Sequence, residues 1–129
     1  MKQLLPALSG LDIVWITAPQ RIPPGKSHPI PNIGKNPGRL IFATLRIFLA
    51  LSEDKPDVVI STGAEIAIPA ALWAKLMRVR FVFVESLCRV SRLSATGLLL
   101  LGLCDLFLVQ WVELSMKYGG RAVYWGRVI

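Results

Sequence analysis

Lys55-Pro56-Asp57-Val58-Val59-Ile60-Ser61-Thr62-Gly63 is a run of β-branched residues that ends in small polar ones. A second run of the same form, Phe81-Val82-Phe83-Val84-Glu85-Ser86, follows it, and a helical pattern over Ile66–Met77 lies between the two. A strand, a helix and a strand in this order are typical of a βαβ unit in a parallel sheet. Ligands of open α/β sheets bind where the strands end, so we expect the functional site at the two polar ends.

The remaining chain extends this pattern to an α/β fold. We expect strands over Asp12–Thr17, Asp57–Ser61, Arg80–Val84 and Asp105–Val109 to form one parallel sheet. Helices should cover both of its faces, because the strands are apolar throughout and do not alternate. The sequence also predicts helices at 39–53, 66–77, 94–103 and 110–118, and the tail of a helix at 1–8. A short last strand is expected at 122–125. Residues 18–38 are rich in proline and glycine, and we expect no regular element there, only a lid, a binding loop or a solvated surface loop.

Composition narrows the function classes. The length of 129 residues predicts a single domain. A hydrophobic share of 53% and a net charge of +7 favour binding to an anionic membrane surface or to a phosphate-bearing ligand. Nucleic acid is disfavoured, because the basic residues are scattered among loops. The cysteines lack metal-ligand spacing, no catalytic Ser/His/Asp set is visible, and no apolar run is long enough to span a bilayer. We therefore expect no metal and no cofactor, and the catalytic residues stay unknown.

Two features keep alternative interpretations open. The predicted helix Arg39–Glu53 is apolar almost all round, so it either packs against the sheet or lies on a membrane. Glu85 is followed by Arg89 and Arg92, which form either a local salt-bridge network or a site for a polar ligand. Arg89 is the better candidate for a pyrophosphate, because a guanidinium can bind it with two hydrogen bonds.

Several segments together resemble one known family. They are Lys55–Gly63, Val84-Glu85-Ser86-Leu87-Cys88-Arg89-Val90, Leu93-Ser94-Ala95-Thr96-Gly97, Phe107-Leu108-Val109-Gln110-Trp111 and Tyr124-Trp125-Gly126. They resemble the membrane-associated subunit of the split UDP-N-acetylglucosamine transferase that makes dolichol-linked chitobiose. They are equally similar to its bacterial relatives in exopolysaccharide and capsule assembly.

The resemblance implies the N-terminal, Rossmann-like half of a GT-B glycosyltransferase, made as a separate polypeptide and peripheral at the cytoplasmic face of the membrane. Such a subunit binds a polyprenyl-pyrophosphate-linked sugar and recruits a donor-binding subunit, with which it shares the UDP-sugar. The acceptor and phosphate site expected here comprises Thr62, Gly63, Glu85, Ser86, Arg89 and Arg92. The expected partner-binding tail comprises Tyr124, Trp125, Arg127, Val128 and Ile129.

One departure from the family is visible at the amino terminus. Family members begin with a strand and a Gly-Gly-His-type loop, whereas this sequence starts inside the helix that follows them. We therefore expect a domain that is truncated at its start and inactive without its partner. Two other function classes stay open, namely the nucleotide-binding α/β domain of another enzyme and a noncatalytic membrane scaffold.

Overall fold

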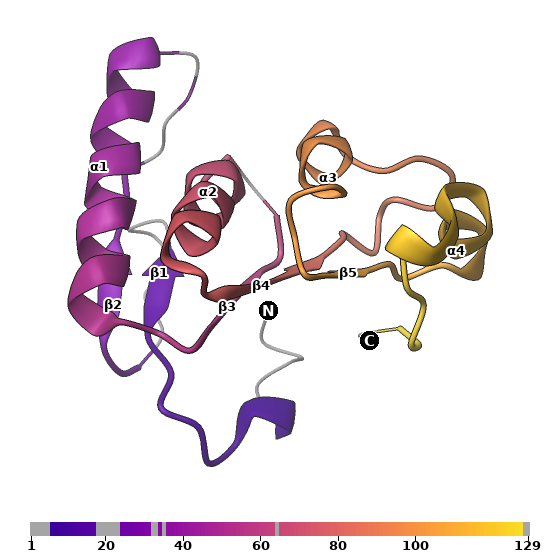
Figure 1. Ribbon diagram of the computed structural model, residues 1–129, viewed down its shortest axis with the longest axis horizontal. Coiled ribbons are helices and arrows are strands. Elements are labelled where there is room, and N and C mark those ends of the chain that lie inside the picture. The colour runs from indigo at the N-terminus through magenta and orange to yellow at the C-terminus, as the bar shows by residue number, and fades with distance from the viewer. Residues whose placement is uncertain (1–5, 18–23, 32–33, 35, 64, 128–129) are drawn as a thin grey trace. The chain divides into compact units, whose positions relative to one another are not determined.

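The computed structural model describes residues 6–17, 24–31, 34, 36–63 and 65–127 (Figure 1). The chain divides into two compact units, Met1–Lys55 and Pro56–Ile129, and each is described by itself. The single domain expected over residues 1–129 stays a prediction. The expected helices and central strands agree closely with the structure, and the main differences lie in the first unit.

The first unit contains a short parallel strand pair and one long helix. Strand β1 (Trp15–Thr17) pairs with β2 (Ser27–Pro29), and Trp15 lies opposite Ser27. Helix α1 (Pro37–Asp54) begins where the Asn36 side chain accepts a hydrogen bond from Gly38 N–H at 2.9 Å, with proline in its first turn. The helix is three residues longer than the sequence predicted, because this cap starts it at Pro37 and a left-handed Lys55 ends it after Asp54.

Helix α1 has one buried stripe and one exposed apolar stripe. Ala43, Ile47, Ala50 and Leu51 are buried. A second set of apolar side chains is exposed on the same helix, namely Leu40, Ile41, Phe42, Leu45 and Leu49. The Arg46 guanidinium lies 5.1 Å from the centroid of the Phe42 ring, so a cation accompanies this exposed stripe. We call Ile41, Phe42, Leu45, Arg46 and Leu49 the α1 face.

The second unit is built on a three-stranded parallel sheet. Its strands are β3 (Val58–Ser61), β4 (Arg80–Val84) and β5 (Leu106–Leu108), in the order β3-β4-β5. The parallel pairing predicted for the first two is confirmed, with Val58 opposite Arg80 and Ser61 opposite Phe83. The elements that follow the strands are α2 (Ala67–Met77), α3 (Ala95–Leu100), α4 (Val112–Tyr118) and the 3-10 turn η3 (Gly119–Arg121).

Aromatic side chains form the core of this second unit. Helices α2 and α3 contact each other and lie on the same side of the strands (Figure 1). Phe81, Phe83 and Phe107 are almost completely buried, and the rings of Phe83 and Phe107 are 5.0 Å apart. The parallel α/β fold expected from the sequence is therefore confirmed, and its core holds the strand ends in fixed positions.

Three details of the predicted fold are wrong. The strand expected at Asp12–Thr17 is shorter and pairs with β2 in a separate sheet, so the segment 18–38 does contain a regular element. The Trp15 N–H donates to the Lys26 carbonyl and the Ile30 N–H donates to the Thr17 carbonyl, both at 2.9 Å, so hydrogen bonds join the two strands at both ends of the pair. The expected last strand at 122–125 is a single parallel bridge between Leu108 and Val123. At the start, the described residues Pro6–Leu8 form a short 3-10 turn, and residues 1–5 lie outside the described part of the chain.

Candidate functional site

The candidate site lies where the strands of the second unit end. Because β3, β4 and β5 are parallel, their carboxyl ends share one edge of the sheet. Thr62 and Gly63 follow β3 and are partly exposed, while Glu85 and Ser86 follow β4. Gly63 has a φ of +103°, a conformation that side-chain-bearing residues rarely adopt. The structure therefore brings the two predicted polar ends to one edge.

The carboxylate of Glu85 is the buried anchor of this edge. The residue is only 3% exposed, and its Oε1 accepts the Ser86 N–H at 2.9 Å. Its Oε2 accepts the Ser94 N–H at 2.9 Å and the Ser94 hydroxyl at 3.0 Å. Both oxygens therefore close the loop 86–94 at its two ends, which we call the β4–α3 loop. A buried carboxylate needs such partners to offset its loss of hydration.

The same bonds start helix α3. Ser94 is its N-cap, and the Ser94 Oγ accepts the Gly97 N–H at 2.9 Å. Gly97 is buried, and a Cβ at this position would lie 2.3 Å from Glu85 Oε2 and 3.2 Å from Phe107 Cζ. Only glycine leaves room for the helix to approach the carboxylate this closely.

Two further side chains hold the β4–α3 loop from outside it. The Trp111 indole N–H donates to the Leu87 carbonyl at 2.7 Å, and the Lys117 ammonium donates to the Ser91 carbonyl at 3.0 Å. The Arg127 guanidinium stacks on the Trp111 ring, 4.0 Å from its centroid. The loop is thus connected through Trp111 to the carboxyl-terminal segment of the described chain.

The loop presents its basic residues to solvent. Arg89 and Arg92 are exposed, as is Ser86. In the described residues no ion pair joins Glu85 to either arginine, because the carboxylate is occupied by backbone N–H groups and the Ser94 hydroxyl. The salt-bridge network considered for this segment is therefore not formed, and both guanidinium groups are available to an anionic ligand.

The predicted partner-binding tail is described in part. Trp125 is 74% exposed and Tyr124 is 36% exposed, whereas Arg127 contacts the Trp111 ring. Val128 and Ile129 lie outside the described residues. Gly126 has a φ of +110°, which turns the chain directly after the exposed tryptophan.

Sequence reasoning missed a cluster in the first unit. Asp54, whose side chain is 6% exposed, pairs with Lys26 and also bonds His28 Nε2 at 2.8 Å. The hydrogen bond from Lys26 lowers the pKa of the Asp54 carboxyl, and the same bond raises the pKa of Lys26. His28, expected in an irregular loop, is therefore on β2 and bonded to the end of α1. No local pattern indicates this cluster, since its members lie 26 and 28 residues apart.

The site also depends on residues whose role was not predicted. Gly97 and Trp111 occur in the segments that resemble the known family, but neither was assigned to the site. A glycine inside an otherwise apolar helix is a signal of close packing, and it would have indicated Gly97. Among the described side chains, no group of three or more His, Cys, Asp or Glu residues is placed to bind a metal ion.

None of the described helices is both long enough and apolar enough to cross a bilayer.

The comparisons with known proteins agree with the geometry. A crystal structure of MurG from Acinetobacter baumannii superposes with a TM-score of 0.73 over 98% of this chain and 39% of that one, at 18% identity. At this identity the likeness shows the fold alone, and it supports the Rossmann-like, GT-B-type architecture expected from the sequence.

Sequence relatives are more specific. The chain is 37% identical over 99 residues to "UDP-N-acetylglucosamine transferase subunit ALG14" of Homo sapiens, covering 69% of this chain and 45% of the relative. It is 43% identical over 81 residues to the protein of that name from Yarrowia lipolytica, covering 58% and 37% of the two chains. The match thus spans less than half the length of these two relatives. Residues 34–128 match the family described as "Oligosaccharide biosynthesis protein Alg14 like", and the chain therefore belongs to the Alg14-like family.

Proposed function

We propose that this protein is the acceptor-binding, membrane-associated subunit of a two-component UDP-sugar glycosyltransferase. Its acceptor is a sugar linked to a polyprenyl pyrophosphate, and it recruits the subunit that binds the UDP-sugar. The observation that carries the proposal is the β4–α3 loop, a segment ordered by a buried carboxylate that leaves Arg89 and Arg92 exposed at the carboxyl edge of the sheet. Membership of the Alg14-like family supports the reaction class.

The roles of the site residues follow from their contacts. Arg89, with Arg92 beside it in the loop, binds the pyrophosphate of the acceptor through charge-assisted hydrogen bonds. Thr62, Gly63 and Ser86 supply polar groups along the same edge. Glu85 is a positioning residue, because its two oxygens already hold the loop that carries Arg89. This division of roles gives the loop a fixed shape before the acceptor arrives, which lowers the entropic cost of binding.

The α1 face supports the membrane part of the proposal. Ile41, Phe42, Leu45 and Leu49 are each at least half exposed, and Arg46 lies among them. A helix with such a face lies in the interface of a bilayer, with its apolar side chains among the acyl chains and its cation at the headgroups.

The decisive experiment uses the full-length protein reconstituted with its donor-binding subunit. Arg89→Ala should lower transfer to a polyprenyl-pyrophosphate-linked sugar by at least about tenfold, the loss expected when one charge-assisted contact worth ~1.5 kcal/mol is removed. The matched control is Arg121→Ala, which removes the same charge from an exposed position on η3. Equal activity of the two variants would remove Arg89 from the site, provided that both retain the wild-type melting temperature.

A further inference from the structure

A second basic site lies at the opposite edge of the sheet. A cavity of about 240 Å³ opens at the amino-terminal ends of β4 and β5, whereas the candidate acceptor site lies at their carboxyl ends. Its wall includes Lys75, Arg78, Arg80, Phe81, Leu103 and Asp105. All of these residues belong to the second unit, so the cavity is complete within it.

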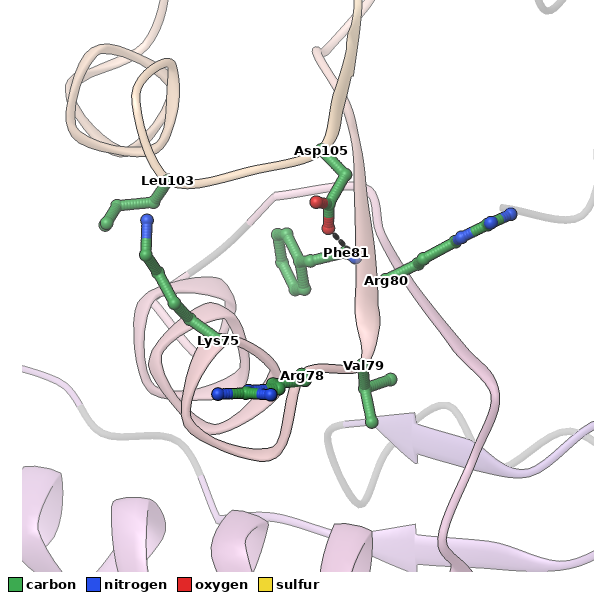
Figure 2. A pocket seen from close by; sticks show the side chains of 7 residues that line it. All are labelled: Lys75, Arg78, Val79, Arg80, Phe81, Leu103 and Asp105. Carbon is green, nitrogen blue, oxygen red and sulfur yellow. Dashed lines mark hydrogen bonds between the residues drawn. The ribbon is translucent and has the colours of Figure 1, made fainter.

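The side chains that line the cavity have distinct directions. Figure 2 shows the Lys75 side chain rising from α2 toward Leu103, with the Phe81 ring between it and the Asp105 carboxylate. The Arg78 side chain lies across the end of α2, and Arg80 points away on the other side of β4. Lys75 and Arg78 are therefore the two cationic side chains whose charge is directed toward the cavity.

The only carboxylate of the cavity wall is already engaged. Asp105 Oδ2 accepts the Phe81 N–H at 2.7 Å, and the Asp105 N–H donates to the Phe81 carbonyl at 2.9 Å. No ion pair within the described residues joins Asp105 to Lys75 or Arg78. Asp105 thus fixes the start of β4 against β5. It does not form an ion pair with Lys75 or Arg78. Two unpaired cations beside a cavity attract an anion, and the one carboxylate does not cancel them.

The geometry points to a phosphate group as the ligand of this cavity. We propose that Lys75 and Arg78 bind a phosphomonoester or diphosphate there, independently of the acceptor site and of the proposed function. Arginine offers phosphate a pair of parallel donors and lysine a compact positive charge, so the two side chains are complementary. A phosphate with one or two negative charges also matches the excess of cations over the single carboxylate.

Two sources can supply this chemistry, a phospholipid headgroup and a soluble phosphorylated compound. Leu72 and Leu76 are exposed on α2 and lie one turn apart, and Leu72 is also three residues before Lys75, so an apolar strip lies beside this lysine on the helix. A lipid source would place its acyl chains along these leucines, whereas a soluble source would leave them uncovered. The test therefore needs one arm for each source.

The first arm titrates the full-length protein with inorganic pyrophosphate at constant ionic strength and follows the backbone amides by NMR. Saturable shifts are expected at residues 75–81 and 103–105. The variant Lys75→Gln/Arg78→Asn should bind at least about tenfold more weakly, which corresponds to ~1.4 kcal/mol. Its control is Lys55→Asn/Arg121→Gln, which removes the same charge and also changes one left-handed helix cap, since Lys55 and Arg78 have φ values of 45° and 57°.

The control should retain its pyrophosphate affinity within about twofold. Absence of saturable shifts at residues 75–81 and 103–105 in the wild-type protein, or an equal loss of the affinity measured at these residues in both double variants, would overturn the proposal. A double variant at Lys75 and Arg78 that melts at a lower temperature but binds pyrophosphate normally would also overturn it, because the two cations would then serve only the end of α2.

The second arm measures flotation with vesicles of phosphatidylcholine alone or with added phosphatidic acid. Weaker binding of the Lys75→Gln/Arg78→Asn variant to the acidic vesicles, with the control unchanged, assigns the phosphate to a lipid headgroup. Unchanged flotation together with weaker pyrophosphate binding assigns it to a soluble compound. Because Arg89 is intact in all of these variants, glycosyl transfer measured alongside separates failure of this site from failure of the acceptor site.

Discussion

At the scale of single residues, one glycine determines whether the candidate site can form. Gly97 lets α3 approach the Glu85 carboxylate so closely that a methyl group would lie 2.3 Å from Oε2. That oxygen cannot retreat without breaking its bonds to the Ser94 N–H and hydroxyl. The position of Arg89 therefore depends on the lack of a side chain at Gly97, eight residues further along the chain.

Replacement of Gly97 by alanine should lower the free energy of unfolding by about 1–2 kcal/mol. Overpacking costs ~1–3 kcal/mol, and the gain in helix propensity of at most ~1 kcal/mol offsets only part of it. Gly102→Ala is the control, because a Cβ there meets no atom within 4 Å. Urea unfolding of both variants measures the difference, and equal stability would show that the close approach is relaxed in solution.

A second prediction at the residue scale concerns how the free energy of unfolding changes at acid pH. The pKa of Asp54 is held below its ordinary value of 3.8 by the Lys26 hydrogen bond. A carboxyl with a lowered folded-state pKa contributes stability above its unfolded pKa, and the contribution is lost as pH falls through the folded pKa. The free energy of unfolding should therefore fall more steeply below about pH 4 in the wild type than in Asp54→Asn. Asp57→Asn, at an exposed position, should keep the wild-type slope, and a wild-type slope in Asp54→Asn would contradict the prediction.

At the scale of elements, the sequence predicts the helices and strands that depend on local residue patterns. β3, β4, α1 and α2 follow from β-branched runs and helical periodicity. The β1–β2 pair does not follow, because Ser27-His28-Pro29 has no strand-like composition and pairs only through long-range hydrogen bonds. The closure of the β4–α3 loop by Glu85 depends on the same kind of long-range contact. Sequence reasoning therefore placed Glu85 at the end of its strand but did not predict that the two carboxylate oxygens close the loop.

The α1 face gives the prediction that belongs to the element scale. The full-length protein should float with vesicles that contain anionic lipid, and salt should weaken the binding, because surface cations contribute ~1 kcal/mol each near an acidic bilayer. Leu45→Gln/Leu49→Gln should reduce flotation several-fold without loss of thermal stability, since both leucines are more than half exposed. Leu11→Gln, at an equally exposed position outside the helix, is the control. Equal flotation of both variants would exclude the α1 face as the membrane contact.

At the scale of the whole molecule, the β4–α3 loop and the carboxyl-terminal tail form one connected structure. Arg127 stacks on Trp111, and Trp111 donates to the carbonyl of Leu87 in the β4–α3 loop. A partner that docks on the tail therefore contacts the segment that supports Arg89. Under the proposed function, this connection would let docking of the donor-binding subunit complete the acceptor site.

Trp125 is the residue on which this docking should depend most. It is 74% exposed, although tryptophan is among the side chains that bury the most apolar area at interfaces. Trp125→Ala should weaken binding of the donor-binding subunit by ~2 kcal/mol, about thirtyfold, while the melting temperature stays unchanged because the side chain has few internal contacts. Met116→Ala is the control, since Met116 is 81% exposed on α4 and lies outside the tail. Calorimetric titration with the partner measures both variants, and equal affinities would place the dock elsewhere on the molecule.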